Sequence, residues 1–532
     1  MKFLYFKLII FIISSLCLFA ENKDSIADKI KVNTNKFNQI LETIYLNYVD
    51  SVDIDAISEE SFRIMMKSLD KHSVYLNKDQ LYTRRVNDRG SGIGIGIEIR
   101  LINDTSVVYY VQAGAPADSA GLKPFDKILS VNDVNIAGKQ IDDIYAMLRG
   151  EKNSLLNITI KEGFSEEIKK VKLTRNDVQI SSLNISLVIP ETKTGYISSK
   201  NFSKISHFEF VNEINKLKEQ GINSLIVDLR DNPGGFLEQV GLIIDEFLQK
   251  GKTISYTKSR NQVYKQTIVS TENGCCEKMP LVLLLNKNSA SGCELFAGLL
   301  QDYDRGIIVG QRSFGKSSVQ RLWNMNDSTG FQMTVAEYFT PLGRSIDIKK
   351  KDSISVDPTL KLNLDDTTFN RISDMVNQFG YGSNLPVYYS ENGRVILGGG
   401  GIFPDFLLEE EQNTLLTTVL LQRNIIFEYV YFFLIVNKNF IESEYQNDKE
   451  RFIRNFRVTD KMLYELKNVS YKKNIWNEEM FQKDKLKISN LIKAEIGRVL
   501  YGNNAYFGIL ITNDKMIEKA VEVMPDSEII YK

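Results

Sequence analysis

Hydrophobic and polar positions change their period along the chain. Between residues 25 and 85, apolar side chains recur three and four positions apart, which predicts helices. We interpret this region as a packing or dimerisation arm with one apolar face, formed by Ile40, Ile44, Tyr45 and Tyr48. After about residue 195, short apolar runs such as Leu225–Arg230 and Leu281–Asn286 alternate with helical periods. Strands that alternate with helices predict an α/β core.

A block of about 90 residues separates these two regions and has its own pattern. Glycines alternate with isoleucines over residues 90–100, ahead of a strand, and the block closes with the strands Leu155–Lys161 and Ile168–Leu173. The glycines lack the spacing of a dinucleotide fingerprint, and no helix follows them directly. A later helix is predicted over residues 139–149, with one apolar face formed by Ile141, Ile144, Tyr145 and Leu148.

The last part of the chain is predicted to be helical and has no catalytic motif. Residues 414–436 are strongly apolar, but they include Gln422, Arg423, Asn424 and Glu428. Four polar residues make a membrane span unfavourable, so we expect a buried helix there. The role of residues 409–532 stays open.

Composition excludes several classes of protein. The chain has 532 residues, which at roughly 150 residues per domain predicts three to four domains. Its 43% hydrophobic and 25% charged residues exclude a largely disordered chain, and its formal charge of −1 gives no sign of nucleic-acid binding. With only His72 and His207, a multi-histidine metal site cannot form. The four cysteines lack metal-binding spacing, so the sequence suggests neither a zinc site nor a disulfide framework.

The first twenty residues predict export. Lys2 and Lys7 precede or flank an apolar stretch, Leu8–Phe19, that ends beside Ala20. The stretch is shorter than the roughly 20 apolar residues of a spanning helix. We therefore prefer an export signal over residues 1–20 to an uncleaved membrane anchor, which remains the alternative.

Two strand-to-helix turns and one lysine are candidates for chemistry. Backbone N–H groups in the turns Asn232–Gly235 and Ser289–Gly292 can stabilise an oxyanion, although a Gly-Gly pair often marks only a tight turn and a serine there is often an N-cap. Lys316 can serve as a base if burial lowers its pKa. The segment from Gly310 to Ser317 matches a phosphate-loop pattern, but a strand rather than a helix is expected to follow, so we do not expect nucleotide binding.

Together these motifs resemble the carboxy-terminal processing peptidases, also called tail-specific proteases. These are exported serine proteases with an inserted PDZ domain. The resemblance covers most of residues 40–408 and rests on many motifs in the same order: Leu69–Tyr75, Gly92–Ile99, Ala115–Leu122, Leu148–Gly150, Asp228–Gly235, Ser289–Glu294, Gln301–Arg305, Gly315–Lys316, Tyr338–Arg344 and Gly398–Asp405.

The resemblance implies a multidomain α+β architecture. Residues 1–20 would be the signal peptide, 21–85 an N-terminal helical region and 86–175 the PDZ domain. Residues 176–408 would form an α/β, crotonase-like protease core, followed by a C-terminal helical region over 409–532.

The family's site residues carry over by position. The resemblance implies that Ser291 is the nucleophile, that Lys316, 25 residues later, is the base, and that Gln320 orients the lysine. The N–H groups of Gly235 and Gly292 would form the oxyanion hole. Ser289 and Cys293 lie at the wrong spacing from the lysine. Matches at His72 and Asp302 are interpreted as structural.

Two positions depart from the family pattern. The chain has Gly292-Cys293 where the family usually has Ala-Ser, and Phe125 where the family usually has glycine. Gly292 still offers an N–H group, so the expected oxyanion hole is retained.

The resemblance also implies how substrate binds. A glycine-rich loop and the strand beside it would take the C-terminal tail of a protein or peptide, with the helix over 139–149 forming part of the pocket. The loop and its edge consist of Gly92, Ile93, Gly94, Ile95, Gly96 and Ile97.

The expected activity is that of an exported serine endopeptidase, periplasmic or associated with the cell envelope, which binds no nucleic acid. Two other functions stay open: a catalytically silent PDZ scaffold and an acyl-CoA hydratase-like enzyme. Natural substrates, membrane association and homo-oligomer formation also stay open.

Overall fold

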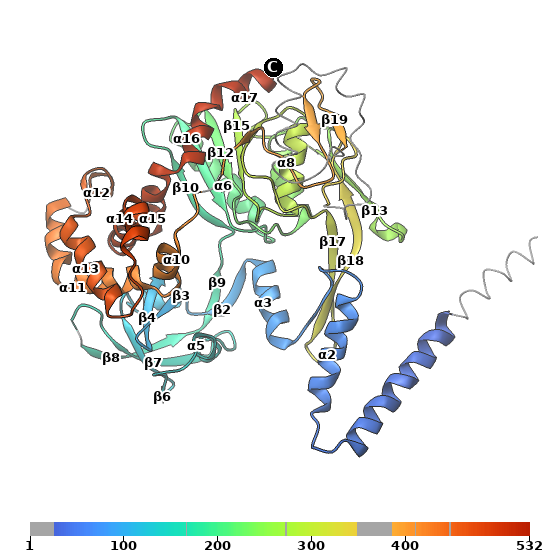
Figure 1. Cartoon of the computed structure of the whole chain (residues 1–532), viewed down its shortest axis with the longest axis horizontal. Helices are drawn as coiled ribbons and strands as arrows, with labels where there is room; N and C mark the ends of the chain where they lie inside the picture. Colours follow the sequence, from blue (N-terminus) through green and yellow to red (C-terminus); the bar gives the residue numbers. More distant parts are fainter. Residues whose placement is uncertain are drawn as a thin grey trace, which may run out of the picture. The chain divides into compact units, whose positions relative to one another are not determined.

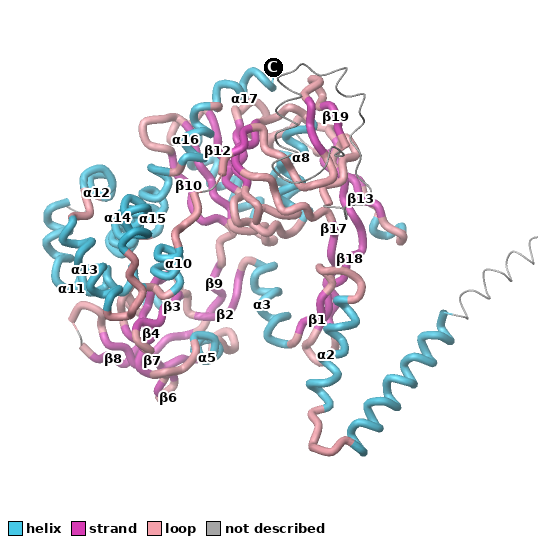
Figure 2. The backbone as a smooth tube through the Cα atoms, viewed as in Figure 1, coloured by secondary structure: helices cyan, strands magenta, loops and turns pink. Residues whose placement is uncertain are grey.

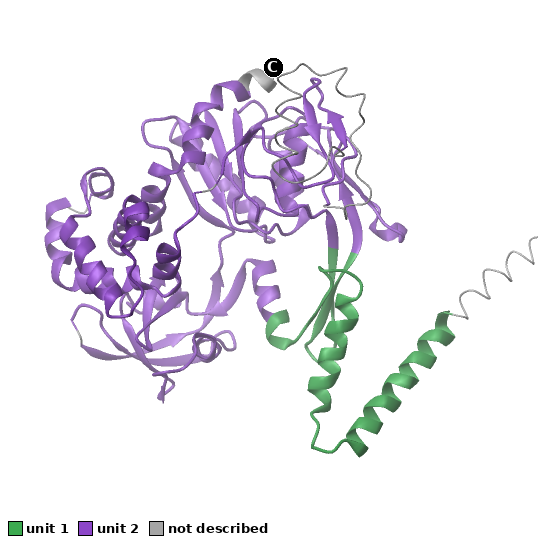
Figure 3. Cartoon of the chain, in the orientation of Figure 1, with its two compact units in different colours: residues 1–81, 320–334 green, residues 82–319, 335–532 purple. Residues whose placement is uncertain are grey.

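The computed structural model describes residues 26–347 and 386–531, apart from residues 166, 272–273, 410 and 446–447. The expected export signal at residues 1–20 lies outside the described residues. The chain divides into two compact units (Figure 3). Unit 1 consists of Met1–Leu81 with Gln320–Thr334, and unit 2 of Tyr82–Val319 with Val335–Lys532.

Unit 1 is mainly helical, as the sequence predicts. It contains a helix over residues 26–47, α2 (Ile54–Lys67), β1 (Val74–Leu76) and the first turn of α3 (Lys78–Arg89). It also holds the outer parts of β17 (Ser318–Asn324) and β18 (Gly330–Phe339). β1 pairs antiparallel with β18, placing Val74 opposite Gln332. Three of the predicted apolar positions on the first helix and just after it are exposed: Ile40, Tyr45 and Tyr48.

A six-stranded sheet forms the centre of unit 2 (Figure 1). Its strands lie in the order β10 (Leu183–Val188), β11 (Thr194–Ser199), β12 (Ser224–Asp228), β15 (Leu281–Leu285), β16 (Ile307–Gly310) and β21 (Phe406–Leu407). Only the β10–β11 pair is antiparallel. Every residue of β12 and β15 is buried, which explains why these strands are nearly continuous apolar runs.

Helices cover both faces of this sheet. On one face Val227 and Leu283 share an apolar cluster with side chains of α6 (Ser206–Glu219), α7 (Leu237–Asp245) and α8 (Gly292–Asp302). On the other face Ile226 and Leu284 share a second cluster with α16 (Lys515–Glu522) and α17 (Met524–Tyr531). The end of the chain therefore forms one layer of an α/β/α arrangement.

Smaller sheets extend the core. β13 (Thr253–Lys258) pairs with β14 (Thr267–Val269) and with the Glu337–Phe339 end of β18, and β19 (Val387–Tyr389) pairs with β20 (Val395–Leu397). Short 3₁₀ turns occur at Gln262–Tyr264 and Ile511–Asn513.

The glycine-rich block forms a separate sheet within unit 2. Its strands lie in the order β3 (Ile97–Ile102), β4 (Thr105–Val111), β5 (Lys127–Val131), β7 (Leu155–Lys161) and β8 (Ile168–Thr174), and β6 (Val134–Asn135) pairs with β5. The helices are α4 (Pro116–Ser119) and α5 (Ile141–Leu148). A two-stranded ribbon, β2 (Ser91–Gly94) with β9 (Asn176–Gln179), brings the two ends of the block together.

The C-terminal region is helical, as predicted, and its first part packs on this sheet (Figure 2). The helices are α10 (Leu415–Gln422), α11 (Ile425–Tyr445), α12 (Lys449–Asn455), α13 (Asp460–Tyr471), α14 (Glu478–Tyr501) and α15 (Asn503–Leu510). Among the described helices, none is by itself long and apolar enough to cross a membrane. α10 and α11 meet the length and composition criteria only as a pair, bent by 63°.

Phe125 lies at the centre of this contact. Its ring centroid is 5.3 Å from that of Phe427 and 5.1 Å from that of Tyr431, both on α11, and the side chain is fully buried. Its backbone φ of +77° falls in the left-handed region that favours glycine. The departure from the family's glycine is thus explained: aromatic packing offsets the backbone strain.

Candidate active site

Ser291 occupies a sharp turn between β15 and α8. Its φ of +56° and ψ of −110° are strained for a residue with a side chain, and it is the N-cap of α8. The positive end of the helix dipole lies at this position, where the N–H groups of Cys293 and Glu294 are already bonded within the turn. The serine is 8% exposed.

The side chains of Ser289 and Cys293, the neighbouring candidate nucleophiles, make hydrogen bonds to other parts of the fold. The Ser289 hydroxyl accepts the Asn286 N–H at 2.9 Å and donates to the Leu229 carbonyl at 2.8 Å. The Cys293 thiol donates to the Asn232 carbonyl at 3.3 Å, and burial raises its pKa well above the usual range, which disfavours the thiolate. Both side chains are fully buried. Local geometry therefore favours Ser291 as the reactive group.

The turn that carries Gly235 packs directly against Ser291. The Asn232 carbonyl accepts the Ala290 N–H at 3.0 Å, and a Cβ added to Gly234 would lie 2.8 Å from the Ser291 Cβ. At Gly235 an added Cβ would lie 2.0 Å from the Phe202 carbonyl oxygen, so no other residue fits without backbone movement. Within the described residues, neither the Gly235 N–H nor the Gly292 N–H donates a hydrogen bond. Both amides can therefore serve an oxyanion.

Lys316 lies in the loop between β16 and β17. It is half-buried, and β17 begins two residues later as a strand, confirming that the helix required by a phosphate loop is missing. The fully buried Tyr338 hydroxyl lies 2.7 Å from the Ser291 carbonyl oxygen and 2.9 Å from that of Lys316. One hydroxyl thus joins the backbones of the expected nucleophile and base.

Glu294 makes a second link between the same two loops. Its carboxylate accepts the N–H groups of Ser291 at 2.8 Å, Gly315 at 2.6 Å and Lys316 at 2.8 Å, and the Ser313 hydroxyl at 2.5 Å. Burial raises its pKa to about 7, although these four hydrogen bonds oppose the shift. The sequence analysis assigned no role to Glu294 or Tyr338. The available signal for Glu294 was its place three residues after an N-cap serine.

Gln320 belongs to unit 1, whereas Ser291 and Lys316 belong to unit 2. Its side-chain amide donates to the Thr334 hydroxyl oxygen at 3.3 Å, between β17 and β18. Its expected role of orienting Lys316 stays a prediction.

Asp302, His207 and His72 each make polar contacts within the fold. Asp302 is buried, pairs with Arg344 at 2.7 Å and accepts the Leu342 N–H at 2.9 Å. The His207 ring lies 2.9 Å from a Glu246 carboxylate oxygen. The His72 backbone N–H donates to Asp70 at 2.7 Å. Among the residues that the structure describes, no three His, Cys, Asp or Glu side chains are grouped so as to hold a metal ion.

The glycine-rich segment is a strand and a turn rather than one open loop. Gly92, Ile93 and Gly94 lie in β2 and pair with β9. Ile95 is buried, Gly96 turns the chain with a φ of +77°, and Ile97 begins β3. The antiparallel ribbon at the ends of the block explains the difference, because alternating glycines gave no sign of a strand partner more than 80 residues away.

Between β3 and α5, a backbone amide of β3 is already hydrogen-bonded to a side chain of α5. β3 forms one edge of its sheet, and the Ile99 N–H donates to the Tyr145 hydroxyl of α5 at 3.0 Å. A substrate strand added to β3 would require this amide.

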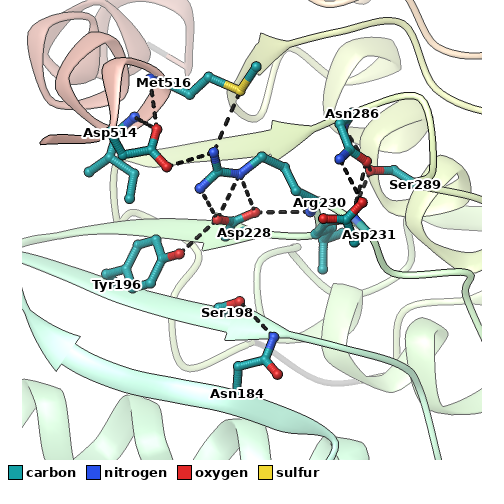
Figure 4. Close-up of polar contacts among 12 residues, drawn as sticks. Asn184, Tyr196, Ser198, Asp228, Arg230, Asp231, Asn286, Ser289, Asp514 and Met516 are labelled. Atoms are coloured by element: carbon teal, nitrogen blue, oxygen red, sulfur yellow. Dashed lines mark hydrogen bonds and ion pairs between the residues drawn. The ribbon is translucent and has the colours of Figure 1, made fainter. Parts of the chain in front are cut away.

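An ionic network around Arg230 ties α16 to the sheet (Figure 4). Arg230 donates to Asp228 at 2.6 Å and pairs with Asp514 at 2.7 Å, and Asp228 also accepts the Tyr196 hydroxyl at 2.7 Å. Asp514 in turn caps α16 by accepting N–H groups of its first turn. The next residue, Asp231, accepts side-chain amides from Asn286 at 2.9 Å and Asn288 at 2.7 Å. Asp231 thus connects the segment before the Gly235 turn to residues that precede the Ser289–Gly292 turn.

Several known families and proteins are similar to this chain. Residues 193–362 match the family model of peptidase family S41, residues 107–162 match a PDZ domain, and residues 416–502 match a family of unknown function. The "Probable CtpA-like serine protease" of Staphylococcus aureus (strain MSSA476) is 30% identical over 371 residues, covering 66% of this chain and 73% of the relative. The "Carboxyl-terminal-processing protease" of Picosynechococcus sp. is 31% identical over 280 residues, covering 52% and 67%. The solved photosystem II D1 C-terminal processing protease is 22% identical with a TM-score of 0.33, covering 69% of this chain and 85% of that chain.

Proposed function

The chain belongs to the carboxyl-terminal processing proteases of peptidase family S41, and on this basis we propose that it is a Ser–Lys endopeptidase that recognises C-terminal protein tails. The PDZ domain, proposed to be inserted over residues 86–175, binds the tail. The crotonase-like core, residues 176–408, cuts the chain. Residues 1–20 direct export to the periplasm or cell envelope.

In this proposal Ser291 Oγ attacks the scissile carbonyl while the neutral amine of Lys316 takes its proton. The carbonyl oxygen becomes an oxyanion that accepts the N–H groups of Gly235 and Gly292. Lys316 then gives the proton to the leaving amine. Water, deprotonated by the same lysine, hydrolyses the acyl-enzyme. Gln320 orients the lysine side chain. No metal or organic cofactor takes part.

The observation that carries this proposal is the double link between the two loops. Glu294 accepts the amides of Ser291 and Lys316, and Tyr338 contacts the carbonyls of the same two residues. A fixed relation between nucleophile and base is what proton transfer requires, because small misplacements cost large factors in rate. Neither a silent scaffold nor a hydratase needs a serine joined to a lysine in this way.

The test is cleavage of a folded reporter that carries an unstructured C-terminal tail. The full chain without residues 1–20 should release a fragment that mass spectrometry identifies as a peptide-bond hydrolysis product. The Ser291→Ala variant should bind the reporter without cutting it. Binding without cleavage by the unaltered chain would support the scaffold, and conversion of an enoyl-CoA substrate would support the hydratase.

A further inference from the structure

A cleft of about 1070 Å³ lies within unit 2, where three parts of the chain meet. The PDZ domain lines it with Gly92–Glu98 and α5, the protease core with Lys200 and Lys216, and the C-terminal helices α14 and α15 with Arg498 and Tyr506. The cleft includes the segment and the helix that are proposed to bind the tail. The C-terminal helices are therefore a third wall of the tail-binding region, which sequence comparison alone did not assign.

Arg498 fixes this third wall against the PDZ domain. Its guanidinium lies 3.5 Å from the ring centroid of Tyr109 on β4 and donates to the Tyr109 carbonyl. It also pairs with Glu495 at 2.8 Å. Arg498 therefore positions the wall, because its charge is already matched.

Among the described residues, Lys216 is the other cation of the cleft with a carboxylate partner, and three further cations have none. Lys216 pairs with Glu213 at 2.6 Å. Arg100, Arg149 and Lys200 have no carboxylate partner within ion-pair distance among the described residues, although Arg100 and Arg149 lie over tyrosine rings. Burial lowers the pKa of Lys200, a desolvation cost that a bound carboxylate would offset. The lining carboxylates are Glu98 and Glu213, so cations are in excess.

One wall of the cleft is continuous along the chain with a contact to the proposed catalytic turn. Two residues after Lys200, the Phe202 N–H donates to the Gly234 carbonyl at 3.0 Å, and the Phe202 carbonyl accepts the Phe236 N–H at 2.9 Å. The wall of the cleft thus continues as a strand-like contact into the turn of Gly235. A polypeptide held along this wall would approach the site from the PDZ side.

We propose that this cleft binds the polypeptide segment just upstream of a substrate's C-terminal residue and selects acidic side chains in it. This inference rests on the proposed function, because it assigns a substrate class to the same tail-binding region. Lys200 supplies a charge from the protease core, and Arg149, directly after α5, supplies one from the PDZ domain. The C-terminal helices close the cleft.

Binding to the uncut chain tests the inference separately from cleavage. Three labelled peptides share one apolar C-terminal end, and three upstream positions carry glutamate, glutamine or lysine. Fluorescence anisotropy with the Ser291→Ala protein should give an affinity about tenfold higher for the glutamate peptide than for the glutamine peptide. The ratio should decrease as ionic strength rises from about 0.05 M to about 0.5 M.

The charge-removing variants Lys200→Gln and Arg149→Gln, each made in the Ser291→Ala background, should reduce that ratio towards one. The matched control is Lys170→Gln on β8, which removes an equal charge from a side chain that is 79% exposed and outside the cleft. It should leave the ratio unchanged. Equal affinities for all three peptides, or a ratio that Lys200→Gln and Arg149→Gln leave intact, would overturn the inference.

Cleavage by the chain with Ser291 intact separates the two proposals. If reporters with all three tails are cut at equal rates, the protease proposal stands and the acidic preference is wrong. If the glutamate peptide binds preferentially but no reporter is cut, the preference stands and the protease proposal fails.

Discussion

The backbone amides of Ser291 and Lys316 donate to the same oxygen atom, Oε2 of Glu294, at 2.8 Å each. The two residues come from loops on different strands, so this shared acceptor sets the distance between those loops. Because the link uses backbone atoms, either side chain can change its rotamer without separating them.

Ser291→Ala should lower kcat/KM by about 10³-fold or more while the protein stays folded, because the attacking oxygen is removed. Cys293→Ser should keep most activity, and alkylating reagents should leave the native enzyme active, since the thiol is fully buried. Ser289→Ala should also keep most activity but lose about 1–3 kcal/mol of stability, because its hydroxyl joins two buried backbone groups. Loss of activity confined to Cys293→Ser would contradict the assignment.

Lys316→Ala should abolish turnover, and substituting the histidines should not. His72→Gln and His207→Gln are expected to keep substantial kcat in the folded protein, which circular dichroism would verify. Because Lys316 must be neutral to accept the Ser291 proton, activity of the native enzyme should rise with pH. Native-like activity in Lys316→Ala would refute a lysine base.

Glu294→Gln should reduce kcat, because its amide group would place a donor against the amides that the carboxylate now accepts. The pKa of about 7 lies above the ordinary value of 4.5, so folding takes up a proton at this carboxyl between those pH values. The stability of the native protein relative to Glu294→Gln should therefore fall as pH rises from 4.5 to 7 and then level off. Denaturant unfolding of both proteins across this range measures the difference.

Ionisation of Glu294 should raise activity, although it lowers stability. The ionised carboxylate accepts all four donors, so native kcat should increase as pH rises through 7, and Glu294→Gln should lack this step. Tyr338→Phe is the companion variant, since it removes the second link without changing charge. A pH profile of Glu294→Gln that parallels the native one would exclude this role.

The sequence predicted most of the strands and helices near the site, and the resemblance predicted its residues by position. β12, β15 and β16 are buried apolar runs that the sequence pattern identifies as strands. Gly235, Ser291 and Gly292 follow two of these strands, so the sequence also shows them as candidates. Glu294 was visible only as a helix-capping residue, because its bonds to Gly315 and Lys316 depend on how two strands are placed. The role of Tyr338 was harder still to predict, since an aromatic residue in a strand usually indicates packing. The position of α16 across the sheet could not be predicted either, because its amphipathic pattern does not specify the surface that it covers.

Tyr145→Phe should increase affinity for C-terminal tails by about fivefold, because the Ile99 amide would no longer be occupied by the tyrosine hydroxyl. KM should fall while kcat stays close to the native value. Tyr389→Phe, on β19 and 48% exposed, is the matched control. Weaker tail binding in Tyr145→Phe would mean that the hydroxyl contacts the tail instead of competing with it.

Asp514→Asn should lower stability by about 2 kcal/mol, since the pair with Arg230 is lost while the cap of α16 can persist. It should also lower kcat more than it raises KM, because Arg230 and Asp228 precede the turn of Gly235. Glu518→Gln on the exposed side of the same helix is the control. If Asp514→Asn and Glu518→Gln lower kcat by similar factors, the loss comes from a less stable α16 and not from the pair with Arg230.

The residue type at position 125 can be used to classify related sequences. A bulky aromatic residue with a positive φ is tolerable only where another part of the chain covers it, and here α11 provides that cover. Relatives that lack the helices after residue 410 should have glycine at this position, and relatives that carry them can afford an aromatic side chain. The identity of one residue in a small PDZ domain would then indicate, even in a fragmentary sequence, whether a helical region follows the protease core.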